Sequence, residues 1–123
     1  MMRSLLSLLL AAVAAHSIVL GIVMLAAPFW MLSLFGWDVA STRFFPAQSG
    51  LFLLILGIVY AAAVRDRSLV WIVVLSKAMA AAFLVGEALG GSCPPVVYVT
   101  AVIDGLMGAA VALLWWRGDR PVR

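Results

Sequence analysis

Four apolar stretches of similar length dominate this sequence and decide what the chain can fold into. They cover residues 5–27, 44–64, 69–89 and 96–116. Each is close to the ~20 residues that cross a ~30 Å hydrocarbon core as an α-helix. None alternates polar and apolar residues over the length of a strand, which excludes a membrane β-barrel. The sequence therefore predicts an all-α membrane protein, a four-helix antiparallel transmembrane bundle in one domain covering residues 1–123.

The composition excludes other classes of protein. The chain is 67% hydrophobic and 11% charged, whereas soluble proteins average about 45–50% apolar and about 25% charged residues. A chain this short could not bury so much apolar surface inside itself, so we expect the lipid bilayer to cover it. The basic residues are not grouped into a patch, and nucleic acid is therefore not an expected partner.

The connection between the first two spans is unusual. It runs over residues 28–43, begins with Pro28, and its segment 29–37 is too apolar for a solvated loop and too short to span a bilayer. We expect a short helix lying in the membrane interface. The other two connections, residues 65–68 and 90–95, are tight turns.

Arginine distribution predicts the orientation, because short loops on the cytoplasmic side carry the excess of Lys and Arg. Alternation of the spans puts six arginines on one side of the membrane and Arg43 alone on the other. The six are Arg3, Arg65, Arg67, Arg117, Arg120 and Arg123. We expect a protein of the inner membrane with both termini in the cytoplasm.

An alternative concerns the first span. Arg3, the apolar run 5–12 and the triplet Ala12-Val13-Ala14 resemble a cleavable secretion signal. The apolar run nevertheless continues to Ala27, which is a spanning length, so we expect the first helix to remain uncut.

Small residues predict where the helices pack, since close backbone approach drives helix association in lipid. Gly50 and Gly57, seven residues apart, share one face of the second span. The third and fourth spans carry small residues at intervals of four, which we interpret as a tight seam. These are Ala78, Ala82, Gly86 and Gly90 in the third span and Ala101, Gly105 and Ala109 in the fourth.

Four ionisable residues lie inside the spans: His16, Lys77, Glu87 and Asp104. Each costs about 3 kcal/mol at the bilayer centre unless it is paired or wet. His16, Lys77 and Asp104 fall within ~4 Å of one level at ~1.5 Å rise per residue. We predict an ion pair between Lys77 and Asp104. It either orders the bundle or forms a proton or ligand site, with His16 as a hydrogen-bonding residue at the same level.

Glu87 lies nearer the outer interface, at the depth of Gln48, Ser49 and Thr100. If it faces inward, these residues form an outward-opening polar pocket beneath the first connection. The single Cys93 cannot form an internal disulfide, and no residue pattern predicts a metal site or a catalytic motif.

Short motifs along most of the chain resemble the DoxX-like group of small four-helix bacterial membrane proteins. They are Ala27-Pro28, Leu34-Phe35-Gly36-Trp37, Gln48-Ser49-Gly50, the segments 56–60 and 63–66, and Asp104-Gly105. The residues themselves predict no cofactor. Some DoxX-like proteins are associated with redox complexes that pass electrons to quinone, so the resemblance leaves quinone open as a ligand without identifying residues for it.

Three functions remain open. The first is an accessory or structural subunit of a membrane assembly or homo-oligomer, favoured by the small-residue faces and the lack of a catalytic constellation. The second is a small proton-coupled carrier that uses the intramembrane charges and would have to dimerise, since four spans are too few for an inverted-repeat carrier. The third is a quinone-interacting redox subunit, with His16 or Asp104 hydrogen-bonding a quinone carbonyl.

Overall fold

Helices make up nearly all of the chain, as the computed structural model of residues 1–38, 42–91 and 93–118 describes it. Within these residues, four helices are long and apolar enough to cross a membrane. The elements are α1 (Met2–Ala26), α2 (Pro28–Leu34), α3 (Phe44–Ala63), the 3₁₀ helix η1 (Arg67–Leu69), α4 (Val70–Leu89) and α5 (Val96–Gly118). The predicted fold class, an all-α membrane bundle of four long helices, is confirmed.

The short helix predicted between the first two spans is α2. Pro28 disfavours a helical conformation of the residue before it, and Ala27 leaves the helical region with φ −135° and ψ 60°. Pro28 then begins α2 at the position where a proline costs no hydrogen bond. Past the end of α2, Gly36 adopts φ +75°, a conformation that side chains other than glycine rarely take. This helix buries Met31 and exposes Trp30, as expected of a helix that lies half in an interface.

The connection between α3 and α4 is fixed by its polar side chains. Asp66 accepts hydrogen bonds from the hydroxyl and the backbone N–H of Ser68, and these two bonds lower the pKa of Asp66. Arg67 reaches across to α1, donating to the backbone oxygen of Arg3 and to Ser7 Oγ at 3.1 and 2.7 Å. The turn is thereby tied to the first turns of α1.

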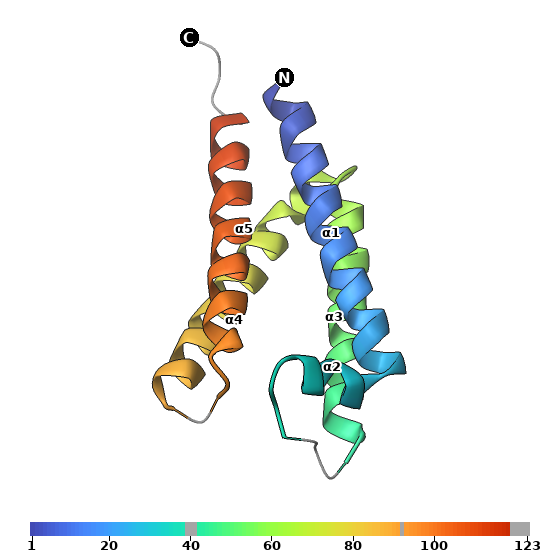
Figure 1. Cartoon of the computed structure of the whole chain (residues 1–123). Helices are drawn as coiled ribbons and strands as arrows, with labels where there is room; N and C mark the ends of the chain where they lie inside the picture. Colours follow the sequence, from blue (N-terminus) through green and yellow to red (C-terminus); the bar gives the residue numbers. More distant parts are fainter. Residues whose placement is uncertain (39–41, 92, 119–123) are drawn as a thin grey trace.

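The four long helices form two antiparallel pairs, α1 with α3 and α4 with α5 (Figure 1). The pairs meet near the end of the molecule that carries Arg3, Arg65 and Arg117, which we call the arginine-rich end. They diverge toward the end that carries α2, which we call the α2 end (Figure 1). All four helices contribute to a hydrophobic core near the arginine-rich end. Its buried residues are Leu6, Leu10, Val13, Ala14, Tyr60, Ala63, Val70, Val73 and Val111.

Glycines allow α1 and α3 to pack backbone to backbone. A Cβ atom on Gly21 would lie 2.6 Å from the backbone nitrogen of Leu54, and one on Gly50 would lie 2.7 Å from that of Leu25. Gly57 approaches Ile18 in the same way, with 2.9 Å from its Cβ position to the Ile18 nitrogen. Gly50 and Gly57 therefore share the face that packs on α1, as their spacing predicts.

The seam predicted between α4 and α5 is wrong for α4. Ala78, Ala82, Gly86 and Gly90 are all exposed, and no atom lies within 4 Å of a Cβ built on Gly86. Lys77, the residue before this ladder, is buried, and one residue along a helix is a rotation of about 100°. Because Lys77 faces α5, Ala78 turns away from it. On α5, Ala101 is buried, Ala109 is exposed, and the close approach falls at Gly108.

Candidate functional site

Polar side chains from all four long helices gather beside the hydrophobic core. They are His16 of α1, Tyr60 of α3, Ser76 and Lys77 of α4, and Asp104 of α5, and we call them the central polar cluster. Every member lies inside a span. The cluster is the candidate site because a polar group at this depth is costly unless other polar groups satisfy it.

The predicted ion pair is present at the middle of this cluster. Lys77 Nζ donates to Asp104 Oδ1 at 2.5 Å, and the two side chains are 5% and 18% exposed. Gly108, one turn further along α5 than Asp104, permits the approach, since a Cβ there would lie 2.9 Å from the Cβ of Lys77. The pair thus joins α4 to α5 where their backbones are close.

Tyr60 extends the cluster to the other helix pair. Its hydroxyl lies 2.6 Å from Ser76 Oγ, and Ser76 Oγ also lies 2.6 Å from the backbone oxygen of Ile72. Because serine has one hydroxyl proton and the Ile72 oxygen can only accept, Ser76 donates to Ile72 and Tyr60 donates to Ser76. The Tyr60 ring centroid is 5.8 Å from Lys77 Nζ, within the range of a cation–π interaction.

His16 approaches the ion pair from α1. Its Nδ1 atom is buried without a hydrogen-bond partner among the described residues. The neighbouring Ser17 Oγ is in the same condition. Of the three residues predicted to share one level, Lys77 and Asp104 form the ion pair, whereas His16 makes no hydrogen bond to either of them among the described residues.

Sequence reasoning missed Tyr60 and Ser76. A signal was available for both, since a tyrosine hydroxyl inside an apolar span needs a partner and Ser76 adjoins Lys77. The hydrogen bond between Tyr60 and Ser76 was not predictable from depth. The Tyr60 backbone is only one turn from the end of α3, and its long side chain reaches a different level of the membrane.

The residues predicted to form an outer pocket are not brought together. Glu87, Gln48 and Ser49 are exposed, and the Thr100 hydroxyl donates to the backbone oxygen of Val97 in its own helix. The splaying of the two helix pairs at the α2 end separates α3 from α4. Glu87 is thus on the exposed surface of α4 and outside the central polar cluster.

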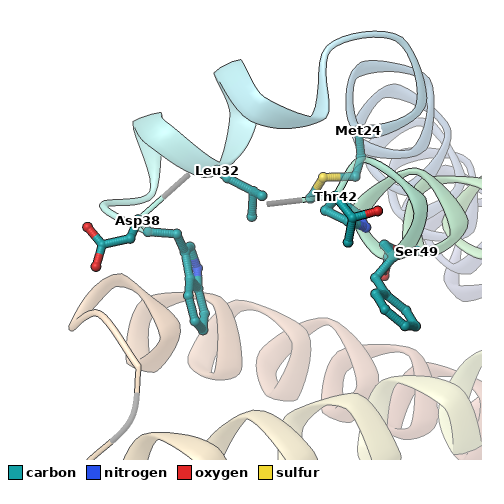
Figure 2. A pocket seen from close by; sticks show the side chains of 8 residues that line it. Met24, Leu32, Asp38, Thr42 and Ser49 are labelled. Atoms are coloured by element: carbon teal, nitrogen blue, oxygen red, sulfur yellow. The ribbon is translucent and has the colours of Figure 1, made fainter. Parts of the chain in front are cut away.

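A pocket of about 330 Å³ does lie beneath α2, and of the predicted residues only Ser49 lines it. Its walls are otherwise largely apolar. The lining residues are Met24, Leu32, Trp37, Asp38, Thr42, Phe45, Pro46 and Ser49. Figure 2 shows Leu32, Met24, Thr42 and Ser49 around the pocket, with the Asp38 carboxylate directed away from them. The Ser49 hydroxyl donates to the Phe45 backbone oxygen, so this pocket offers few free polar groups.

The groups of the central polar cluster can hold and exchange protons. The cluster contains an amine, a carboxylate, an imidazole and a phenol, and none is arranged as a nucleophile activated by a base. Among the described residues, no group of three His, Cys, Asp or Glu side chains could hold a metal ion.

Fold and site together define the class: a small multi-pass membrane protein of four spanning helices with a polar cluster inside the bundle. No family model, no curated protein and no solved structure matches the chain.

Proposed function

We propose that this protein is a non-catalytic subunit of a membrane assembly in a bacterial inner membrane, similar in kind to the DoxX-like proteins. The observation that carries the proposal is the exposed small-residue face of α4, formed by Ala78, Ala82 and Gly86. Small residues at such spacing allow another helix to approach closely in lipid. The described helices of this chain leave the face uncovered, so a helix of a second copy or of another subunit is its natural partner.

The assembly is tested by Ala82→Phe. An added ring on a packed helix face costs about 1–3 kcal/mol, so the assembled fraction should fall roughly tenfold at a fixed protein concentration. Cross-linking in the membrane, followed by sizing in mild detergent, measures it. Ala109→Phe is the matched control, since Ala109 is an exposed alanine of α5, and it should leave the assembly intact. Equal losses in the two variants, or a monomeric wild type, would contradict the proposal.

We also propose that both termini lie in the cytoplasm, supported by the arginines at one end of the bundle. A membrane-impermeant maleimide should then label Cys93 in intact cells, because its turn lies at the opposite end. A Ser68→Cys variant in a Cys93→Ser background should be labelled only after the membrane is permeabilised. Labelling of both positions in intact cells, or of neither, would overturn this orientation.

A second candidate function, a proton-coupled carrier, is favoured by the unpartnered Nδ1 atom of His16 beside the Lys77–Asp104 pair. A proton bound at this level would have to reach both faces of the membrane. On the side of the arginine-rich end, the hydrophobic core lies between the cluster and the membrane surface. A carrier would therefore need the two pairs to move relative to each other.

A further inference from the structure

A groove lies between α1 and α3 on the side of the arginine-rich end, and we call it the alanine groove. It encloses about 590 Å³. It is lined by Ala11, Ala14, Ala15, Ile18, Ala61, Ala62, Val64 and Arg65. Five of these eight side chains are single methyl groups, so the two helices contact each other without filling the space beside their contact. All the residues on α1 lie within its span, so the groove faces the hydrocarbon region.

Arg65 stands at the mouth of this groove. It follows α3 by two residues, so it lies at the level where the span ends and the lipid headgroups begin. Its guanidinium makes no hydrogen bond or ion pair with the residues that the structure describes, whereas Arg43 and Arg67 donate to backbone oxygens. The adjacent Asp66 forms no ion pair with Arg65 within the described residues, and its carboxylate is hydrogen-bonded by Ser68 instead.

We propose that the alanine groove binds a phospholipid, with the phosphate on Arg65 and one acyl chain along the alanine floor. A guanidinium matches the geometry of a phosphate with two parallel hydrogen bonds. The floor from Ala11 to Ile18 runs about 10 Å into the membrane at ~1.5 Å per residue. A lipid with its headgroup at Arg65 would therefore have its acyl chain pointing into the bilayer, as lipids do. The site is independent of the α4 face on which the proposed function rests.

Native mass spectrometry of the full chain, released from detergent with added phosphatidylglycerol, tests the site. We expect one retained lipid on the wild type and roughly tenfold or greater weakening in Arg65→Gln, since charged hydrogen bonds are among the strong ones. Arg117→Gln removes an arginine at the same end that does not line the groove, and it should retain the lipid. Ala62→Phe should abolish retention by filling the groove from an exposed position, whereas Ala109→Phe should not.

Two competitors separate the parts of the ligand. Diacylglycerol, which lacks the phosphate, should compete poorly, and inorganic phosphate, which lacks the chains, should not displace the lipid. If Arg65→Gln and Arg117→Gln weakened lipid retention equally, the cause would be the general positive charge of this end, and the proposed site would be wrong. Displacement by inorganic phosphate would identify an anion site instead of a lipid site. Thermal unfolding of each variant in detergent shows whether a variant that loses the lipid has also lost its fold. If one of the two groove variants is unstable, the test rests on the variant whose stability equals that of the wild type.

Discussion

Replacing Gly50 with leucine should prevent α1 and α3 from packing together and should destabilise the folded protein by about 3 kcal/mol or more. A Cβ at this position would lie 2.7 Å from the Leu25 nitrogen and 2.9 Å from the Gly21 oxygen. Both are backbone atoms and cannot rotate aside, so the helices themselves would have to separate. Unfolding in detergent, followed by circular dichroism, measures the loss.

Gly86→Leu is the matched control for this prediction. It makes the same chemical change in a spanning helix, but no atom lies within 4 Å of its Cβ position. Leucine is also the better helix former by up to about 1 kcal/mol, so the stability of the isolated chain should be unchanged or slightly raised. Similar losses for the two variants would mean that Gly50 is not at a backbone contact.

The helices of this protein could be predicted because the bilayer constrains them. A span must be about 20 residues of helix, and the apolar runs between turns have that length. The helix α2 was predictable from an apolar connection that begins with Pro28, since a proline begins a helix readily and ends the one before it. Both arguments use only residue types and spacing along the chain.

The rotation of each helix about its axis was harder to predict. An interval of four residues drifts by about 40° per step relative to the 3.6-residue turn, so the spacing of a small-residue ladder does not by itself say which neighbour the ladder faces. In α4 the ion pair determines the rotation instead, because Lys77 must face Asp104 and thereby turns Ala78 and Gly86 outward. Gly21, which contacts Gly50, was missed because its partner lies on another helix.

The sequence predicted the membrane depth of the candidate site, but not all of the residues that belong to it. Counting residues along the spans placed His16, Lys77 and Asp104 at one level, and the structure joins Lys77 to Asp104. The same counting grouped Glu87 with Gln48, which the divergence of the helix pairs separates. Depth follows from the helical rise, whereas contact between helices depends on packing that the sequence of one helix does not contain.

Neutralising only one partner of the Lys77–Asp104 pair should be the most damaging change at this site. Lys77→Met leaves the Asp104 carboxylate unpaired inside the bundle, and Asp104→Leu leaves the ammonium unpaired; either loss costs about 3–5 kcal/mol in buried pairs. The double variant removes both charges and should recover much of the loss. In a double-mutant cycle of unfolding in detergent, the coupling should exceed the ~0.5 kcal/mol typical of independent sites. Additive effects would show that the pair does not act as a unit.

The same double variant separates the two proposed functions, because it is expected to fold. If the pair only orders α4 against α5, the Lys77→Met/Asp104→Leu protein should keep both its stability and its assembly. A carrier would instead lose its activity, since the variant can no longer bind a proton at this level. Proton uptake into proteoliposomes, read with a pH-sensitive dye inside them, measures that activity for the wild type and the variant. We expect the assembly to persist and no proton uptake in either protein; uptake by the wild type alone would make the cluster a transport site.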